Sequence, residues 1–319
     1  MADTTKLISI IAPCLNEELN IEPFYKEILK VFDDLGEEYS FELIFADDSS
    51  SDKTVSLIKE LIEKDKRVKL IINARNYGVY KNSFNAIKYA TGDALIPNLP
   101  VDLQDPPSLM VEFVKHWKSG KKAIIGTRKN RNEFFIAKLI RLSYYNLVSK
   151  LSDYKLIKYG GEYGLLDSTL YKKLLLFDDY YPYTRGLIAS LTDNILEVPY
   201  FWEKRKHGKS NYSFFKYYDH GINGIISTSR NVLRKFTFVG LFFSIIVFIF
   251  VVYQFINFIF FDRSLIPPGT LTILLIVTFF SLFTFISISI LSEYIIAIHS
   301  QVRNNIGVIE QELVNIETS

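Results

Sequence analysis

Residues 6–13 read KLISIIAP, a short run of mostly apolar side chains that ends at a proline. A run of this length is typical of a strand that is buried on both faces. Residues 20–35 follow with apolar side chains at helical spacing, and residues 41–46, FELIFA, form a second apolar run. A strand, a helix and a second strand in this order predict a βαβ unit, in which the two strands are parallel.

The same alternation continues along the chain. Apolar spacing predicts further helices at 52–64, 82–90 and 108–119, and further strands at 68–72, 94–97 and 123–126. We therefore expect an α/β fold with a mostly parallel sheet and helices on both faces. Ligands bind outside the carboxyl ends of the strands in such sheets, so the residues that follow each strand are the candidates for function.

Composition excludes several classes of protein. The chain has 319 residues, and its 37 Lys and Arg nearly balance its 35 Asp and Glu, which gives a formal net charge of +2. This balance argues against a nucleic-acid-binding protein. Cys14 is the single cysteine, so an intrachain disulfide and a cysteine-based zinc site are excluded. Aromatic residues make up 15% of the chain and mean hydropathy is +0.13, which indicates a membrane part beside a globular domain.

Two long uncharged runs, residues 239–261 and 271–292, lie towards the C-terminus. Each is long enough for a transmembrane helix, which needs about 20 residues. Buried core helices are the alternative, but uncharged runs of this length are rare in soluble cores. Pro267, Pro268 and Gly269 predict a turn between the runs, and therefore a hairpin of two antiparallel spans.

The charges that flank this hairpin predict its orientation. Arg234 and Lys235 precede the first span and Arg303 follows the second, whereas Asp262 offsets Arg263 in the connection. The excess of basic residues at the outer ends places both ends in the cytoplasm. The polar start of the chain also predicts no signal peptide. We therefore expect a multi-pass protein of the cytoplasmic (inner) membrane with a cytosolic N-terminal domain and both termini cytosolic.

These patterns divide the chain into four parts. We expect a cytosolic domain at 1–211, amphipathic interfacial helices at 212–235, two transmembrane helices within 236–298, and a cytosolic C-terminal tail at 299–319. An ordinary surface helix that packs on the domain is the alternative for residues 212–235. Their position next to a span favours the membrane interface.

Acidic residues gather where the predicted strands end. Glu17 lies after the first strand, Asp48 after the second and Asp102 after the fourth. Carboxylates at one sheet edge can accept hydrogen bonds from ribose hydroxyls, or hold Mg²⁺ or Mn²⁺ against a diphosphate. A helix N-cap is the alternative for any one of them, and it suits Asp52 best. Asp48 and Asp102 together favour a binding site.

Seven segments together resemble family 2 glycosyltransferases of the Rossmann-like GT-A fold. They are residues 7–21 (LISIIAPCLNEELNI), 41–54 (FELIFADDSSSDKT), 73–78 (NARNYG), 90–107 (ATGDALIPNLPVDLQDPP), 159–167 (YGGEYGLLD), 183–187 (YTRGL) and 205–212 (RKHGKSNY). The chain is most similar to the polyprenyl-phosphate branch, namely dolichol-phosphate mannose synthases and bacterial undecaprenyl-phosphate glucosyltransferases. The resemblance covers nearly the whole chain, including the two C-terminal spans.

The resemblance implies roles for particular residues. Those implied to bind the donor nucleotide are Pro13, Asn16, Glu17, Asp48, Gln104, Gly208, Lys209 and Ser210. Those implied to bind the acceptor phosphate are Arg128, Lys138 and Arg141. Those implied to be catalytic are Asp102, Glu162 and Arg205. Asp102 matches the second Asp of the DxD motif, which binds the donor diphosphate through a divalent cation, Mg²⁺ or Mn²⁺.

Three positions depart from the family pattern. Pro100 stands where the first Asp of DxD is expected, and a proline offers neither a side-chain oxygen nor an N–H. Glu162 stands in place of an Asp after the double glycine, and Gly164 in place of an Arg. These departures keep a non-catalytic, membrane-anchored nucleotide-sugar-binding protein as an alternative.

The implied reaction is transfer of a sugar, with inversion, from a nucleotide sugar to a polyprenyl phosphate of the bilayer. The glucosyltransferase branch points to a UDP-linked donor and to undecaprenyl phosphate, and the product would serve cell-surface glycan modification or assembly. The family resemblance also implies a homo-oligomer, and family members suggest a tetramer. A processive polysaccharide synthase of the same fold is a further alternative, which the absence of a QxxRW segment and the two spans disfavour.

Overall fold

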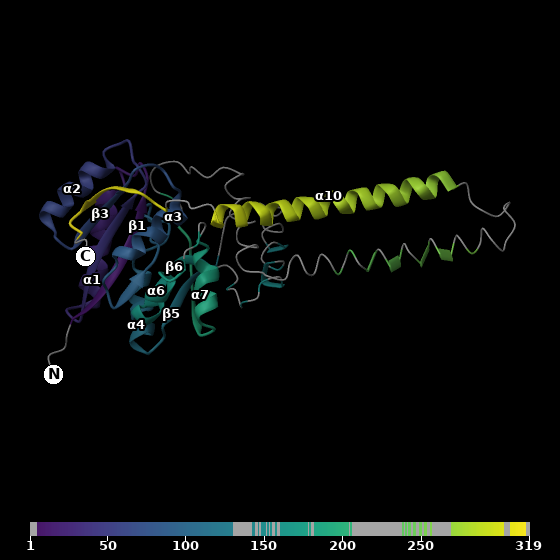
Figure 1. The fold of residues 1–319 in the computed structure, drawn as a ribbon. Helices are drawn as coiled ribbons and strands as arrows, with labels where there is room; N and C mark the ends of the chain where they lie inside the picture. The colour runs from purple at the N-terminus through teal and green to yellow at the C-terminus, as the bar shows by residue number, and fades with distance from the viewer. Residues whose placement is uncertain are drawn as a thin grey trace.

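Eight strands form one sheet at the centre of a domain from which a long helix projects (Figure 1). This is a computed structural model that describes residues 5–129, 160–177, 182–203, 205, 269–302 and 307–316, with scattered residues of 142–157, 179 and 238–256. The predicted interfacial helices, at 212–235, lie outside the described residues.

The elements take the following bounds. The strands are β1 (Lys6–Cys14), β2 (Tyr39–Asp47), β3 (Val68–Asn73), β4 (Ala94–Ile96), β5 (Ala123–Arg128), β6 (Gly160–Asp167), β7 (Ile195–Tyr200) and β8 (Glu310–Val314). The described helices are α1 (Ile21–Leu35), α2 (Thr54–Lys64), α3 (Val79–Ala86), the short 3-10 helix η1 (Ile87–Tyr89), α4 (Leu109–Lys118), α6 (Ser168–Leu174), α7 (Thr184–Leu191) and α10 (Gly269–Val302). All the strands and helices predicted between residues 6 and 126 are therefore confirmed, with small shifts at their ends.

The sheet runs in the order β7-β5-β6-β4-β1-β2-β3-β8. β1 pairs in parallel with β2 and β4, β2 with β3, and β5 with β7, whereas β6 and β8 are antiparallel to their neighbours. The predicted α/β fold with a mostly parallel sheet is confirmed. The sequence did not predict β6, β7 or β8, because glycine or charged residues interrupt their apolar patterns.

Each face of the sheet supports a separate hydrophobic cluster. Side chains of α1, α2 and α4 cover one face, and Ile10 of β1 points into this cluster. Side chains of α3, η1, α6 and α7 cover the other face, and Ile11 points into that one. Neighbouring residues of β1 are thus buried on opposite faces, as the alternation of side chains along a strand requires.

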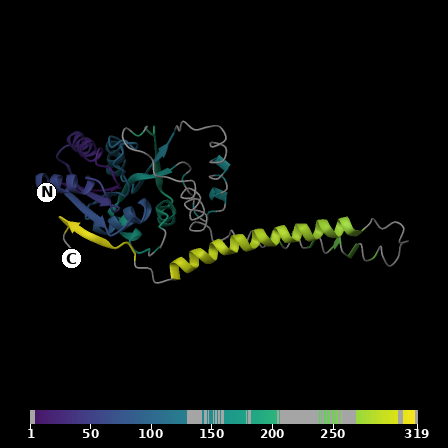
Figure 2. The same cartoon turned by 90° about the horizontal axis from the view of Figure 1, so that it is seen from above.

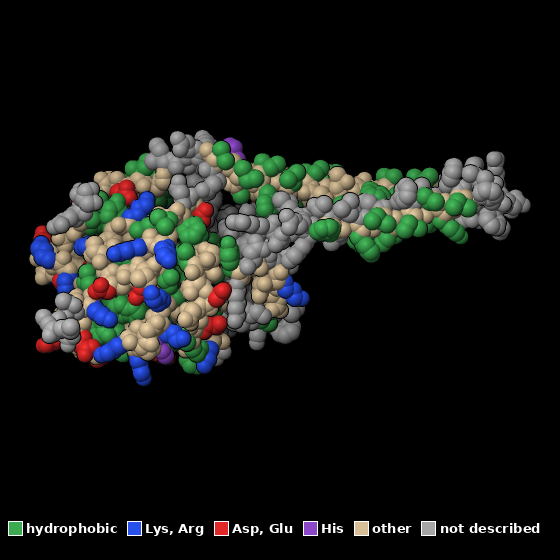
Figure 3. Space-filling model, turned by 60° about the horizontal axis from the view of Figure 1, so that its bottom comes forward, with side chains coloured by type: hydrophobic (Ala, Val, Ile, Leu, Met, Phe, Trp, Pro, Cys, Tyr) green, Lys and Arg blue, Asp and Glu red, His purple; other side chains and the backbone are tan. Residues whose placement is uncertain are grey.

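The helix α10 carries the second predicted span and extends beyond it at both ends. Its segment Ile276–His299 is long and apolar enough to cross a membrane, none of its residues is buried, and most of its apolar side chains are exposed. Figure 3 shows apolar surface along this projecting arm, whereas the charged side chains gather on the domain. This exposure excludes the alternative of a buried core helix for α10. The described residues of the first run are helical, and Phe243 contacts Phe279 of α10 with ring centroids 5.4 Å apart.

After α10 the chain returns to the domain and ends in the sheet. β8 pairs with β3, so residues 310–314 of the predicted tail form an edge strand of the domain. Figure 2 shows β8, in yellow, along the edge of the domain while α10 extends away from it. The two ends of the apolar region therefore connect to one folded unit.

Candidate active site

The loops after β1, β2 and β4 are held in unusual backbone conformations. Asn16, Ser49 and Leu103 have φ angles of 54°, 69° and 59°. Residues other than glycine seldom adopt positive φ, and they do so where the surrounding structure holds them. The three loops follow the carboxyl ends of neighbouring strands, where the sequence predicts the site.

Hydrogen bonds connect the loop after β1 to the loop after β2. The Asn16 amide N–H donates to Ser50 Oγ at 2.9 Å, and Asn16 Oδ1 accepts from the Ser51 N–H at 2.8 Å. The Glu17 N–H donates to Thr54 Oγ1 at 2.8 Å. Pro13 lies within β1 itself, beside Ala46 of β2. Asn16 and Glu17 are therefore fixed relative to the end of β2.

The Asp48 carboxylate is buried and accepts hydrogen bonds from the last residue of β3 and from the segment that follows it. Its Oδ1 accepts from Asn73 Nδ2 at 3.0 Å and from the Tyr77 N–H at 2.8 Å. Its Oδ2 accepts from the Gly78 N–H at 2.8 Å. Asp48 thus determines the shape of the loop at residues 74–78, which we call the donor loop.

Three predicted residues meet beside this region. Arg205 forms an ion pair with Glu17, although the two residues lie far apart in the chain. Burial raises the pKa of the Asp102 carboxyl, and the positive charge of Arg205 opposes that rise. Gln104 binds the backbone of Glu203 in both directions, at 3.0 and 3.3 Å, which joins the Asp102 loop to the segment that carries Arg205. The tertiary structure therefore brings together Glu17, Asp102 and Arg205.

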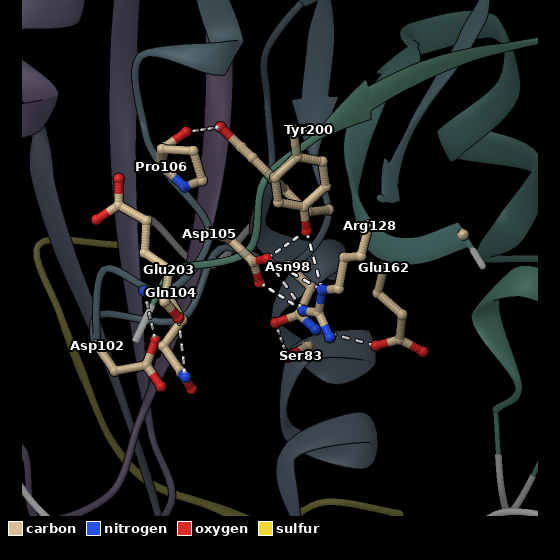
Figure 4. A network of polar contacts seen from close by, with 12 residues as sticks. Ser83, Asn98, Asp102, Gln104, Asp105, Pro106, Arg128, Glu162, Tyr200 and Glu203 are labelled. Carbon is tan, nitrogen blue, oxygen red and sulfur yellow. Dashed lines mark hydrogen bonds and ion pairs between the residues drawn. The ribbon is translucent and has the colours of Figure 1, made fainter. Parts of the chain in front are cut away.

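Arg128 makes a bidentate ion pair with a carboxylate that the sequence analysis did not single out (Figure 4). Its Nη2 lies 2.8 and 3.0 Å from the two oxygens of Asp105, and its Nε donates to the Tyr200 hydroxyl at 3.0 Å. The guanidinium also lies 5.0 Å from the ring centre of Trp202. Arg128 therefore ties the loop after β4 to β5 and β7.

Glu162 lies buried on β6 with one oxygen that has no partner in the described structure. Asn98 Nδ2 donates to its Oε2 at 3.0 Å, whereas its Oε1 lacks a hydrogen bond to any described group. Burial raises the pKa of Glu162 to about 7, although the charge of Arg185 and the bond from Asn98 oppose the rise. A buried oxygen without a partner is costly, and it is typical of a position where a ligand binds.

Comparison with known proteins assigns this region to a family. Residues 9–164 match the family described as Glycosyl transferase family 2. This match identifies a glycosyltransferase domain of this kind in the N-terminal part of the chain. The matched range extends from within β1 into β6 and includes Glu17, Asp48, Asp102 and Glu162. The predicted glycosyltransferase is confirmed at the level of the family.

Several relatives align along most of the chain. It is 29% identical to the "Putative glycosyltransferase CsbB" of Bacillus subtilis, over 91% of this chain and 86% of that protein. It is 28% identical to the "Bactoprenol glucosyl transferase" of Shigella phage SfII, over 93% of this chain and 95% of that protein.

Two solved structures resemble part of this chain. One is the mannosyltransferase PcManGT from Pyrobaculum calidifontis in complex with GDP-Man and Mn²⁺, with a TM-score of 0.48, 16% identity, and coverage of 70% of this chain and 63% of that one. The other is glucosyl-3-phosphoglycerate synthase from Mycobacterium tuberculosis, with a TM-score of 0.47, 19% identity, and coverage of 70% and 78%.

The family 2 domain offers a cation few ligands of its own. Among the described residues, no three His, Cys, Asp or Glu side chains lie close enough together to hold a metal ion. Glu17 is engaged by Arg205, and Pro100 supplies no oxygen from its side chain. Mg²⁺ is commonly held by one or two carboxylates together with substrate phosphates. The side chains present fit a cation that binds with the donor diphosphate at Asp102.

Five of the predicted site residues lie outside the described residues, so their roles stay predictions. They are Lys138, Arg141, Gly208, Lys209 and Ser210. Sequence reasoning missed Asp105, Asn98 and Tyr200, which hold the described part of the site together. Asp105 and Asn98 lie in the segment that follows β4, where functional residues are expected, so their position could have indicated them. No local sequence pattern indicates Tyr200.

Proposed function

We propose that this chain transfers a sugar, with inversion, from a UDP-sugar to the phosphate of a membrane polyprenol such as undecaprenyl phosphate. The observation that carries the proposal is the meeting of Asp102, Glu17 and Arg205 at the carboxyl ends of the parallel strands. Relatives named bactoprenol glucosyl transferase align with more than nine tenths of the chain, which supports glucose as the sugar and a polyprenyl phosphate as the acceptor.

The donor nucleotide would bind over the loops after β1, β2 and β3. Asn16 and Glu17 lie on a loop that is hydrogen-bonded to the loop after β2, so both are preorganised for a ligand. Asp48 holds the donor loop by accepting hydrogen bonds from the N–H groups of Tyr77 and Gly78. We assign the remaining donor contacts to Pro13, Gln104, Gly208, Lys209 and Ser210.

The chemistry requires alignment and charge compensation more than a strong base. A phosphate monoester has its second pKa near 6, so the attacking lipid phosphate is largely dianionic at pH 7. Its oxygen forms the bond to the anomeric carbon as the bond to the nucleoside diphosphate breaks, and this single displacement inverts that carbon. Arg205 would stabilise the negative charge on the departing diphosphate. Glu162 would bind a hydroxyl of the donor sugar through its free Oε1.

A divalent cation, Mg²⁺ or Mn²⁺, held by Asp102 and the donor diphosphate would supply further charge neutralisation at the leaving group. We assign the acceptor phosphate to Arg128, Lys138 and Arg141. Arg128 is already paired with Asp105, so it would act on the acceptor while that pair is held.

We call α10 and the apolar run that precedes it, residues 239–261, the apolar arm. This arm would hold the domain at the bilayer that contains the acceptor. We infer two spans near residues 239–261 and 271–292, interfacial helices at 212–235, and a cytosolic domain and tail in the inner membrane. Tethering an enzyme to the surface where its acceptor resides raises the effective concentration of both partners. A homo-oligomer, which the family resemblance suggests is a tetramer, completes the proposal.

A second function is motivated by Pro100, which removes one carboxylate from the diphosphate site. In that case the chain binds a nucleotide sugar at the membrane without turning it over.

The purified full chain with undecaprenyl phosphate, UDP-glucose or GDP-mannose, and with or without Mn²⁺, separates the two functions. We expect lipid-linked glucose from UDP-glucose, and a loss of about 100-fold or more in turnover for Asp102→Asn, because this change removes charge stabilisation from the transition state. Nucleotide binding without any lipid-linked product from the wild type would favour the binding protein.

A further inference from the structure

The edge strand β8 connects the apolar arm to the donor side of the site. α10 ends at Val302 and the described backbone resumes at Gly307, just before β8 (Glu310–Val314). The residue that follows β8 is fixed as well, because Asn315 Nδ2 donates to the carbonyls of Lys66 and Val68 at 2.8 and 2.7 Å. The strand is therefore held at the edge of β3 immediately after the chain leaves α10.

A β-bulge turns two glutamates of this strand towards opposite faces of the sheet. Glu312 lies opposite Ile72 and Glu310 lies opposite Asn73, so Gln311 is the extra residue. Residues two apart in a regular strand point to the same face, and a bulge breaks that rule. Glu312 forms an exposed ion pair with Lys59 of α2 at 2.8 Å.

Glu310, by contrast, contacts α3 and η1 on the other face of the sheet. Its Oε1 accepts from Asn85 Nδ2 at 2.6 Å and from the Tyr89 hydroxyl at 3.0 Å. Asn82 belongs to the same helix as Asn85, and its Oδ1 accepts from Asn73 Nδ2 at 2.9 Å. The same Asn73 amide donates to Asp48.

The residue before β8 contacts the donor loop directly. The Ala74 N–H donates to the Ile309 carbonyl at 2.9 Å, and the Ile309 N–H donates to the Tyr77 hydroxyl at 3.3 Å. Tyr77 and Gly78 in turn donate their backbone N–H groups to Asp48. Two sets of contacts thus connect the returning strand with the Asp48 carboxylate. One passes through α3 and Asn73, and the other passes through Tyr77.

We propose that β8 is a positioning element of the donor site, with Glu310 and Tyr77 as its positioning residues. The strand holds the donor loop and α3 around Asp48, so the nucleotide pocket is complete only when the chain has returned from the apolar arm. This inference rests on the proposed function for the identity of its ligand, a uridine diphosphate. Glu310 and Tyr77 would therefore affect nucleotide binding without contacting the nucleotide.

Two glutamates of one strand provide a matched pair of variants for the test. Glu310→Ala removes the bonds to α3 and η1, whereas Glu312→Ala removes the exposed pair on the opposite face. With the full chain in detergent micelles, calorimetry measures the Kd for UDP and steady-state assays measure KM for UDP-glucose and kcat. We expect Glu310→Ala to raise Kd and KM by about tenfold with kcat within about twofold, because hydrogen bonds to a charged group are lost.

The controls distinguish positioning from general loss of stability. Glu312→Ala should bind UDP as the wild type does, and Glu310→Gln should recover most of the affinity because its side-chain oxygen still accepts both bonds. Equal weakening in both alanine variants, or wild-type affinity in Glu310→Ala, would overturn the proposal. If Glu310→Ala does not fold, Tyr77→Phe replaces it, and we expect a weaker effect in the same direction.

Hydrogen exchange tests the positioning without any nucleotide. The amides of Tyr77 and Gly78 should exchange about tenfold faster in Glu310→Ala than in Glu312→Ala, because local opening exposes them more often. Unchanged exchange overturns the inference. A wild type that binds neither UDP nor GDP contradicts the proposed function alone, since the exchange result still decides whether β8 holds the donor loop.

Discussion

At the scale of the residue, the carboxylates of the site divide into two groups. Asp48 and Asp105 accept several hydrogen bonds or ion pairs from the protein itself, so their role is to fix loops. Glu162 keeps one oxygen without a described partner, and Asp102 accepts one backbone N–H from Gln104 at 3.2 Å. The second group therefore keeps acceptor oxygens without described partners, as the proposed binding of substrate requires.

Glu162→Gln tests the raised pKa of the buried carboxyl. Burial raises this pKa from 4.5 to about 7. The folded protein then binds the proton more tightly than the unfolded chain does, so stability from this group is full below pH 4.5 and is lost as the pH rises to 7. We expect the variant and the wild type to unfold at similar temperatures at pH 4.5, and the variant to be more stable at pH 8 by at most about 3 kcal/mol. Thermal unfolding at both pH values measures this, and equal melting temperatures at pH 8 would contradict it.

Arg128→Lys and Asp105→Asn separate loop positioning from acceptor binding. Either change breaks the bidentate pair that holds the loop after β4, so we expect each to lower kcat by about tenfold. The double variant should lose little more than the single ones, because the two residues act together. The KM for undecaprenyl phosphate should rise only where Arg128 is changed. Steady-state assays measure both constants, and an unchanged KM in Arg128→Lys would remove Arg128 from the acceptor site.

At the scale of the element, close approach of two strands explains one departure from the family pattern. A Cβ atom at Gly164 of β6 would collide with the carbonyl oxygen of Ile124 and lie 2.9 Å from Ile125 Cδ1. The antiparallel pairing of β5 with β6 therefore has no room for a side chain here. The arginine that the family resemblance implies here does not fit this position as the strands lie.

Gly164→Ala should therefore destabilise the domain, whereas Gly161→Ala provides the control on the same strand. A Cβ at Gly161 would meet only ordinary contacts, the nearest at 3.6 Å. We expect Gly164→Ala to cost about 2 kcal/mol or more, as overpacking in a core does, and Gly161→Ala to cost much less. Thermal unfolding of the two full-length variants measures the difference. Similar melting temperatures would mean that β5 and β6 separate easily.

At the scale of the whole molecule, the pairing of β8 with β3 constrains the topology. The apolar arm lies between two parts of one sheet, so both ends of the arm connect to the same domain. A folded domain cannot lie on two sides of a bilayer. If α10 crosses the membrane, the chain therefore crosses an even number of times between Arg205 and Gly307.

Single-cysteine labelling tests this arrangement, since Cys14 is buried and burial raises the pKa of its thiol. In inside-out vesicles we expect an impermeant maleimide to label Glu60→Cys on α2 and Gln311→Cys on β8, but not Ser264→Cys between the two apolar runs. Right-side-out vesicles should give the reverse pattern. Labelling of positions 60 and 311 from opposite sides would exclude the β3–β8 pair in the membrane-bound protein.

The sequence alone determined the strands β1 to β5, the helices between them and the apolar arm. It also indicated Asp48 and Asp102 as strand-end carboxylates. These features depend on local periodicity and on the rule that ligands bind at the carboxyl ends of parallel strands. Both can be applied to a short stretch of chain without knowledge of the rest.

Only the tertiary structure decided which groups pair. Glu17 with Arg205, Arg128 with Asp105, and β8 with β3 each join segments that are far apart in sequence. Which groups pair depends on which loops lie next to each other once the sheet has formed, and no local sequence pattern predicts this. A charged side chain at a strand end therefore predicts a site, but whether it binds substrate or fixes a loop depends on the donors that folding brings to it.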